Sequence, residues 1–300
     1  SLVGSEMCIR DRPYPMTFGK NEIKTGYISG ACTHPDYRNR GAMRELLSQA
    51  FTRMLHNDMA VSTLIPAEPW LFGYYAGMGY APVFRYSSTI FTASEVTTAN
   101  EAVVLNKIND YQEEVYRYLD RKLRERPYCI QHTETDFRVI LADLQLGKGC
   151  VYILKQGDKI PALAIVYPAG STWQAGEVVA ETPEMHSLLL QRICGQLNIP
   201  FIRVIAPAAA GQNPQVLGMA RIINAKTVLQ QYAAEHPEQE MSIALTDPQI
   251  SANNGYYYLN NGKCMNSAKR LPGSHLALTI GELAKKILSS LHPYMSLMLN

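Results

Sequence analysis

The sequence predicts an α+β protein of two or three domains, because its 300 residues leave room for units of about 100–150 residues each. Three observations support this fold class. Amphipathic helical patterns alternate with strand-sized apolar runs. The order strand–helix–strand occurs twice along the chain. Turn residues at Gly157-Asp158 and at Asn260-Asn261-Gly262 separate pairs of short runs, which predicts two hairpins.

The N-terminal end is unusual. The sequence does not begin with Met, and residues 1–12 have too short an apolar stretch for a secretory signal peptide. They are similar to a translated sequencing-adapter artefact. They are therefore interpreted as lying outside the fold, with natural sequence missing upstream. On this interpretation an N-terminally extended chain is expected to be more soluble, because an uncovered sheet edge promotes aggregation.

The clearest helical pattern of the chain lies between two predicted strands. Its apolar residues recur at helical spacing and are Met43, Leu46, Leu47, Ala50, Phe51, Met54 and Leu55. The strand Ile23–Thr33 precedes this helix and the strand Ala60–Ile65 follows it. A short aromatic helix, Pro69–Ala76, and an extended segment, Tyr80–Phe91, complete the first block.

The rest of the chain repeats this organisation and then extends it. A linker at Thr92–Asn100 is followed by a charged helix, a hairpin and a second strand–helix–strand series that has no basic glycine turn. These segments are Tyr111–Arg126, Cys150–Leu154, Leu163–Tyr167, Val178–Ala180, Pro183–Leu197 and Phe201–Ile205. A second linker, Ala206–Pro214, precedes the last helices and strand, at Lys226–Glu235, Met241–Thr246 and Ile280–Leu288. The final residues, His292–Asn300, are largely apolar, which indicates a buried end.

Composition excludes several classes of protein. Hydrophobic residues make up 47% of the chain and charged residues 18%, which is far from the disordered class. The net charge of +2 gives no general reason to expect a nucleic-acid partner. No apolar run reaches the roughly 18–20 residues of a membrane span, so no membrane is expected and the cytoplasm is the expected location. The six cysteines form no C-x-x-C pair, which predicts free thiols and no metal site.

The strongest chemical signal is Arg38-x-x-Gly41-x-Met43, between a predicted strand and the amphipathic helix. Free N–H groups at a helix N-terminus, together with the helix dipole, favour an anion there. Gly41 permits a close approach of the backbone, and Arg38 and Arg40 supply cationic donors to phosphate oxygens. A solvated basic turn would explain an isolated R-x-x-G. The strand–turn–helix context favours a pyrophosphate site instead.

A second signal is Tyr75-Ala76-Gly77-Met78-Gly79-Tyr80, which follows the next predicted strand. A tyrosine hydroxyl, whose pKa is near 10, can protonate a leaving thiolate. Alone, this segment is better explained as core or surface aromatics. Its position downstream of the first motif favours the functional interpretation.

The two motifs together resemble the core signature of the GNAT-superfamily N-acetyltransferases, which is strand–(Q/R)-x-x-G-x-(G/A)–helix–strand–helix with Y-x-x-x-G-(F/Y). Met43 departs from the small residue that is usual in the first motif. This departure and the rest of the chain resemble the enhanced intracellular survival (Eis) subgroup. The resemblance implies a partial GNAT domain at 13–97, a second, degenerate GNAT-like domain at 98–208 and a sterol-carrier-protein-like domain at 209–300. The segment Met219–Asn224 resembles the start of the third.

The resemblance also implies a set of residues that bind acetyl-CoA, the acetyl donor. The strand residues Ala31, Cys32 and Thr33 would bind the pantetheine arm through their backbone and polarise the thioester carbonyl. The pyrophosphate would be held by Arg38, Asn39, Arg40, Gly41 and Ala42.

Catalytic and substrate-binding roles follow from the same resemblance. Tyr75 matches the general acid of the family, with Tyr74 as the alternative if the register differs by one. The C-terminal carboxylate, on Asn300, matches the base, and a tail that docks only for stability is an equally weighted alternative. Glu68 and Trp70 would line the amine pocket, or alternatively cap and pack the short helix.

The implied function is transfer of an acetyl group from acetyl-CoA to a primary amine by direct attack in a ternary complex. An amine with a pKa near 10.4 must first lose a proton, so a base or water chain is needed. A covalent route through Cys32 is disfavoured, because no histidine is clearly placed to activate the thiol. Small polyamines, aminoglycoside-like amines and protein lysines are all candidate acceptors, and a homo-oligomer is implied. Weak cofactor binding is expected if upstream elements are missing. The alternative function is a non-catalytic protein that binds an apolar ligand in the sterol-carrier-like domain.

Overall fold

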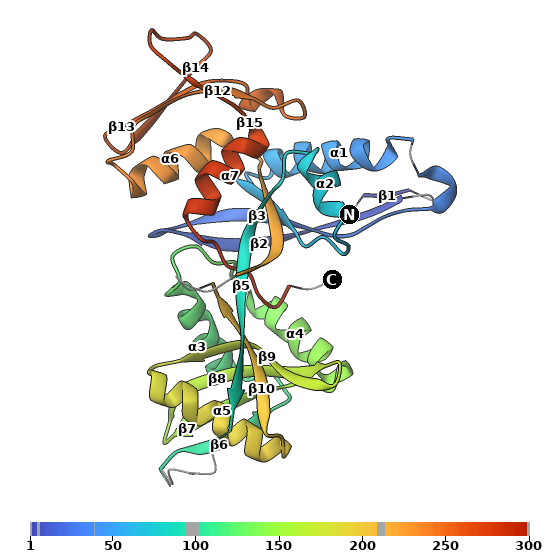
Figure 1. Ribbon diagram of the computed structural model, residues 1–300, viewed down its shortest axis with the longest axis vertical. Coiled ribbons are helices and arrows are strands. Elements are labelled where there is room, and N and C mark those ends of the chain that lie inside the picture. The colour runs from blue at the N-terminus through green and yellow to red at the C-terminus, as the bar shows by residue number, and fades with distance from the viewer. Residues whose placement is uncertain (1, 5–6, 39, 94–101, 209–213, 299–300) are drawn as a thin grey trace.

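The computed structural model describes residues 2–4, 7–38, 40–93, 102–208 and 214–298. Their strands form one sheet of eleven strands and one of four. The larger sheet runs along the molecule in the order β1-β2-β3-β4-β11-β5-β10-β9-β8-β7-β6, and the smaller sheet lies at one end (Figure 1). Helices pack on both sheets, so the predicted mixture of helices and strands is confirmed.

The first third of the chain builds one end of the large sheet. Its elements are β1 (Leu2–Gly4), β2 (Met7–Phe18), β3 (Asn21–Thr33), a 3-10 turn (Pro35–Tyr37), α1 (Ala42–His56), β4 (Val61–Leu64), α2 (Leu71–Ala76) and β5 (Ala81–Thr92). The predicted strand–helix–strand–helix–strand series is confirmed. Helix α1 buries the predicted apolar stripe, including Leu47, Phe51 and Met54, against the sheet.

Residues 7–12, interpreted from the sequence as lying outside the fold, form the first half of β2. They pair with β3 in antiparallel register, from Met7 opposite Thr33 to Arg12 opposite Tyr27. This pairing is made by backbone N–H and C=O groups, so it needs no apolar pattern in the sequence. The structure thus places these residues in the second strand of the large sheet, between the edge strand β1 and β3.

The middle of the chain builds the other end of the large sheet. Its elements are β6 (Val104–Ile108), α3 (Glu113–Arg124), α4 (Glu134–Leu146), β7 (Cys150–Gln156), β8 (Lys159–Ala169), β9 (Thr172–Ala180), α5 (Pro183–Leu197) and β10 (Phe201–Pro207). Helices α3 and α4 cover one face and α5 covers the other. In β7, Val151 and Ile153 therefore pack on α3 and α4, while Tyr152 and Leu154 pack on α5.

Helix α4 is missing from the prediction, although the sequence carries its signals. Four buried residues recur at helical spacing, namely Phe137, Ile140, Leu141 and Leu144. Thr133 and Asp136 form a reciprocal capping box at its start. The prediction also lacks β6 and β15 (Leu276–Thr279), which are edge strands of five and four residues with few buried positions.

The last third of the chain contributes to both sheets. Its elements are β11 (Gln215–Ile222), α6 (Ala225–Glu235), β12 (Met241–Thr246), a 3-10 turn (Ser251–Asn253), β13 (Gly255–Asn260), β14 (Lys263–Ser267), β15 and α7 (Ile280–Ser290). From the resemblance, everything from residue 209 onward is expected to form a third domain. Strand β11 instead lies between β4 and β5, with Met219 opposite Leu64 and Ile222 opposite Val61. The C-terminal region thus completes the sheet of the first block.

Helices α6 and α7 lie between the small sheet and the large one (Figure 1). Ile243 and Tyr257 of the small sheet belong to the same buried cluster as Phe18 and Val83 of the large sheet. The inner face of the small sheet is therefore filled by packed side chains, which does not favour the apolar-ligand alternative. Within the described ranges, no helix combines the length and apolarity needed to cross a membrane.

Candidate functional site

The site begins where β3 and β4 separate. They pair in parallel only from Thr25 opposite Val61 to Ile28 opposite Leu64, and β4 then ends while β3 continues to Thr33. A bulge lies in this continuation, since Gly30 has φ +60° and the register with β2 shifts there. Along Ser29–Thr33, the backbone edge of β3 that faces away from β2 is therefore not paired with β4. An extended ligand can pair with such an edge as an added strand.

The turn after β3 presents the N-terminus of α1 to the same region. Gly41 is the residue before the helix and has φ +79°, a left-handed conformation that glycine adopts without strain. A Cβ at Gly41 would have no atom within 4 Å, so the backbone conformation, not lack of space, favours glycine here. No side chain caps the first turn of α1. Its N–H groups are therefore available to an anion.

Arg38 lies beside this helix start. Its Nε donates to the carbonyl of Thr33 at 3.3 Å, which ties the side chain to the end of β3. Arg44, in the first turn of α1, adds a second cation that no sequence motif indicated. Only the register of the helix could have indicated it, because a start at Gly41 places Arg44 in the first turn. A positive charge near a helix N-terminus interacts unfavourably with the helix dipole. The position of Arg44 therefore favours a role in binding an anion.

Tyr75 stands on α2, across from the helix start. Its side chain is 7% exposed, and its ring lies edge-on to the rings of Tyr74 and Tyr80, with centroids 5.4 Å and 5.7 Å away. Burial raises the pKa of Tyr75 above its ordinary value, and the neighbouring Tyr74 raises it further. The hydroxyl therefore stays protonated near neutral pH and can act as a proton donor.

A single cavity of about 550 Å³ brings these groups together. It is lined by Ala31, Cys32, Thr33, Arg38, Gly41, Ala42, Met43, Arg44, Trp70, Leu71, Tyr74 and Tyr75. Hereafter this is the β3–α1–α2 cavity. Most of the residues expected at the cofactor site and Tyr75 thus share one space.

The remaining predicted site residues are placed differently. Arg40 and Glu68 are exposed and do not line the β3–α1–α2 cavity; the backbone carbonyl of Glu68 accepts from Leu71 N–H at 3.0 Å at the start of α2. Trp70 lines the cavity but is 69% exposed. Asn39 and Asn300 lie outside the described residues.

A second cavity of about 500 Å³ lies on the opposite side of the end of β4. Leu64 packs in the cluster that contains Tyr75, whereas the next residue, Ile65, lines the second cavity. Successive side chains of an extended segment point to opposite faces, so the cluster around Tyr75 and the second cavity lie on opposite faces of this strand end. The walls of the second cavity include Tyr86, Ser88, Asp143, Tyr167, Gln174, Arg203, Gln215, Leu217 and residues 294–298. We call it the interdomain cavity.

The C-terminal segment forms one wall of the interdomain cavity. Tyr294, Met295 and Ser296 are buried, as the apolar ending of the sequence indicated. Tyr294 exchanges backbone hydrogen bonds with Tyr128 and Ile130 at 2.9 and 3.0 Å. The segment thus crosses from α7 to the middle of the molecule.

The second strand–helix–strand series, β9–α5–β10, has no comparable anion site. The N-terminus of α5 is capped by Thr182, whose hydroxyl accepts from Met185 N–H at 3.3 Å. Glu181 and Glu184 flank this start, and Glu181 pairs with Arg121. Acidic residues around a capped N-terminus repel phosphate groups. Among the described residues no cluster of three or more His, Cys, Asp or Glu side chains could hold a metal ion.

Comparison with known proteins identifies a domain in the N-terminal part of the chain. Residues 1–83 match the family model described as an acetyltransferase (GNAT) domain, so the N-terminal part of the chain contains such a domain. No curated protein matches the sequence.

Solved structures match the chain over most of its length. A GCN5-related N-acetyltransferase from Anabaena variabilis superposes with a TM-score of 0.73 at 16% identity, covering 94% of this chain and 76% of that one. Another from Kribbella flavida gives 0.73 at 16% identity, covering 98% and 84%. Eis1 from Mycobacterium abscessus gives 0.73 at 12% identity, covering 96% and 79%. At these identities the likeness shows a shared fold.

Proposed function

We propose that this chain is an acetyl-CoA-dependent N-acetyltransferase of the Eis-like subgroup, acting on a primary amine. The observation that carries the proposal is the β3–α1–α2 cavity, in which an unaccompanied strand edge, an uncapped helix N-terminus and a buried tyrosine face one space. These three features match the three parts of the donor, which are an amide-containing arm, a pyrophosphate and a thioester.

The residues present fit this donor. The edge of Ser29–Thr33 suits the pantetheine arm, whose amide groups would pair with the backbone as an added strand does. The N–H groups at the start of α1 suit the pyrophosphate, with Arg38, and by proposal Asn39 and Arg40, as further donors. Acetyl-CoA would supply the acetyl group to be transferred.

The chemistry assigned to the chain is general acid catalysis with oriented reactants. The acceptor nitrogen forms a bond to the acetyl carbon while the carbon–sulfur bond breaks. Tyr75 donates its proton to the departing sulfur, and N–H groups of the β3 edge stabilise the developing charge on the carbonyl oxygen. The proton lost by the amine passes to a base, for which the C-terminal carboxylate of Asn300 is the proposed group.

The interdomain cavity is the proposed entry for the amine. One of its lining residues, Ile65, directly follows Leu64, which packs in the cluster that contains Tyr75. An acceptor bound there would reach the thioester across the end of β4, from the side opposite the pantetheine arm. Glu68 and Trp70 lie on the segment between β4 and α2, and they stay candidates for contact with an acceptor at the mouth of the site.

The test is an assay of thiol release from acetyl-CoA with a panel of amines, comprising a polyamine, an aminoglycoside and a lysine-containing peptide. Tyr75→Phe is expected to lower kcat by about 10²–10⁴-fold, the usual contribution of a positioned general acid. Tyr74→Phe is the matched control and should keep activity within a few-fold. The proposal would be overturned if none of the amines in the panel supported release of thiol and the chain had no affinity for acetyl-CoA.

A further inference from the structure

A buried ion pair lies behind the helix that carries Tyr75, outside both cavities. Arg221 of β11 and Asp247, the residue after β12, are fully buried, and Nη2 of Arg221 lies 2.7 Å from Oδ1 of Asp247. Removing two charges from water costs more than their attraction returns unless further hydrogen bonds satisfy both groups. The additional hydrogen bonds of Arg221 and Asp247 therefore indicate the structural role of this ion pair.

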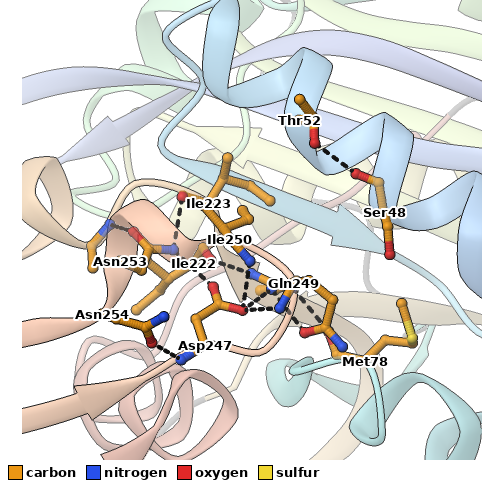
Figure 2. A network of polar contacts seen from close by, with 12 residues as sticks. Ser48, Thr52, Met78, Ile222, Ile223, Asp247, Gln249, Ile250, Asn253 and Asn254 are labelled. Atoms are coloured by element: carbon orange, nitrogen blue, oxygen red, sulfur yellow. Dashed lines mark hydrogen bonds and ion pairs between the residues drawn. The ribbon is translucent and has the colours of Figure 1, made fainter.

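Arg221 joins three separate parts of the chain. Its Nε donates to the carbonyl of Met78 at 2.9 Å, and its Nη1 donates to the carbonyl of Ile222 at 2.7 Å. Gln249 accepts from Nη2 at 3.2 Å, and the guanidinium lies over the ring of Phe51 in α1, 4.4 Å from its centroid. In Figure 2, dashed lines mark hydrogen bonds that meet in the space between the labelled residues Met78, Ile222, Asp247 and Gln249.

Asp247 is held in place without help from Arg221. Its Oδ1 also accepts from the N–H groups of Gln249 and Ile250, at 3.0 and 3.1 Å, and its Oδ2 accepts from Nδ2 of Asn253 at 2.8 Å (Figure 2). Asn253 in turn accepts from the N–H of Ala225 at the start of α6. Asp247 is thus a fixed anchor in the C-terminal region.

The carbonyl that Arg221 holds belongs to the turn that follows the tyrosine helix. In this turn the N–H groups of Met78 and Tyr80 both donate to the carbonyl of Tyr75, at 2.9 and 3.1 Å. The Tyr80 hydroxyl lies 2.7 Å from the hydroxyl of Ser62 on β4. Tyr75 and its turn therefore form one packed unit, and Arg221 supplies its outer hydrogen bond.

Gly79 allows the turn after α2 to approach the guanidinium of Arg221 closely. It has φ +85°, and a Cβ there would lie 2.7 Å from Cγ2 of Ile280 and 3.3 Å from Nε of Arg221. A side chain at this position would push the turn away from the guanidinium. The glycine of the second sequence motif is thus explained by the approach of β11 and α7.

We infer that Arg221, anchored by Asp247, is a positioning residue for Tyr75. The inference rests on the proposed function, and it gives the C-terminal region a part in the activity of the N-terminal block. Without the guanidinium the Met78 carbonyl loses its buried donor, the turn relaxes, and the Tyr75 hydroxyl moves relative to the thioester. A misplacement of about 1 Å costs about 10²-fold in rate.

Two variants separate the charge pair from the donor to Met78. Asp247→Asn removes the ion pair but keeps Arg221 and its bond to Met78. The double variant Arg221→Met/Asp247→Asn also removes that bond, and it leaves no unpaired buried charge that would prevent folding. Leu190→Ala, a buried residue of α5 at the far end of the molecule, controls for a general loss of stability.

We expect the double variant to lower kcat by about 10²-fold while the Kd for acetyl-CoA, measured by calorimetry, stays within about twofold. Leu190→Ala should keep kcat close to that of the unsubstituted chain, whereas Asp247→Asn, which weakens the anchor but keeps the donor to Met78, should lower kcat less than the double variant does. Equal kcat in the double variant and in Asp247→Asn would overturn the inference. So would an equal fall of kcat in Leu190→Ala, because the effect would then be one of stability.

Hydrogen exchange gives a readout that does not depend on turnover. The amides of Met78 and Tyr80 should exchange faster in the double variant than in Asp247→Asn, while those of α5 stay unchanged. Unaltered protection of both amides would overturn the inference even for a chain that turns over. If the unsubstituted chain shows no turnover but these amides respond, the proposed function fails and the positioning of Tyr75 by Arg221 stands.

Discussion

The hydroxyl of Ser296 donates a 2.6 Å hydrogen bond to Oε2 of Glu177, although 119 residues separate them in the chain. Glu177 is fully buried on β9 and also accepts from Nη1 and Nη2 of Arg126, at 3.1 and 2.7 Å. The guanidinium of Arg126 lies over the ring of Tyr294, 5.0 Å from its centroid. One carboxylate thus fastens the C-terminal segment to the middle of the molecule.

Substitution of this carboxylate should destabilise the protein far more than substitution of its tail partner. Glu177→Ala leaves the mostly buried Arg126 without its counter-charge, for which we expect a loss of about 3–5 kcal/mol in the free energy of unfolding. Ser296→Ala removes a single hydrogen bond and should cost about 1–3 kcal/mol. Urea denaturation measures both. Equal losses would show that the ion pair does not hold this region.

Substitution of Gly41 should destabilise the protein through backbone strain and not through steric overlap. Gly41→Ala forces a Cβ into a left-handed conformation, with an expected cost of about 1–2 kcal/mol in stability, although nothing lies within 4 Å of that Cβ. Gly77→Ala is the matched control, because Gly77 has an ordinary helical φ of −63°. Thermal unfolding of the two variants checks the difference. A smaller loss at Gly41 than at Gly77 would contradict it.

The pH dependence of activity should have no falling limb below pH 10. Tyr75 must be protonated to act as an acid, and burial raises its pKa above the ordinary value of 10.0. The acceptor amine must be neutral, so kcat/KM should rise with pH as the amine loses its proton. Initial rates from pH 6 to pH 10 test this. A decrease of activity with rising pH that begins below pH 9 and disappears in Tyr75→Phe would contradict the assignment.

Acid should destabilise the contact between His132 and the C-terminal segment. His132 is buried, its Nε2 lies 2.9 Å from the carbonyl of Ser296, and its ring meets that of Tyr14 edge-on. Burial lowers its pKa, against smaller opposing effects of Ser296, Asp136 and Glu177. The unfolded chain then binds the proton more readily. Stability from this group is therefore complete above pH 6.5 and is lost as the pH falls below it.

The control for this prediction is His132→Gln, whose amide can still donate to Ser296. Denaturant midpoints measured between pH 7.5 and pH 5 should fall less steeply in His132→Gln than in the unsubstituted chain. Because burial also lowers the pKa of His186, some dependence on pH should persist. Identical slopes in the two proteins would contradict the prediction.

Local patterns predicted much of the N-terminal block, and long-range pairings account for what they missed. The spacing of Leu46, Leu47 and Phe51 defined α1, and its register placed Gly41 at the helix start. The position of β11 between β4 and β5 depends on backbone pairing across more than a hundred residues, for which no periodicity in the chain gives a register. The contact between Arg221 and Met78 therefore could not be predicted from the sequence.

The same reasoning applies to the candidate site. Ala31, Arg38, Gly41 and Tyr75 were selected because their motifs are short and local, and they line one cavity. Arg44 was overlooked for lack of a motif, although it lies in the same helix turn. The interdomain cavity could not be anticipated, because its walls come from β5, α4, β8 and the C-terminal segment, which only the folded chain brings together.

The most direct test of the central claim is a calorimetric titration of acetyl-CoA into the chain, with Gly41→Glu as the paired variant. We predict micromolar binding by the unsubstituted chain and none by Gly41→Glu, because a carboxylate at the start of α1 would repel the pyrophosphate. Arg38→Ala should weaken binding by about tenfold, the loss of one charge-assisted contact. Absence of binding by the unsubstituted chain, or equal affinity in Gly41→Glu, would contradict the account of the β3–α1–α2 cavity.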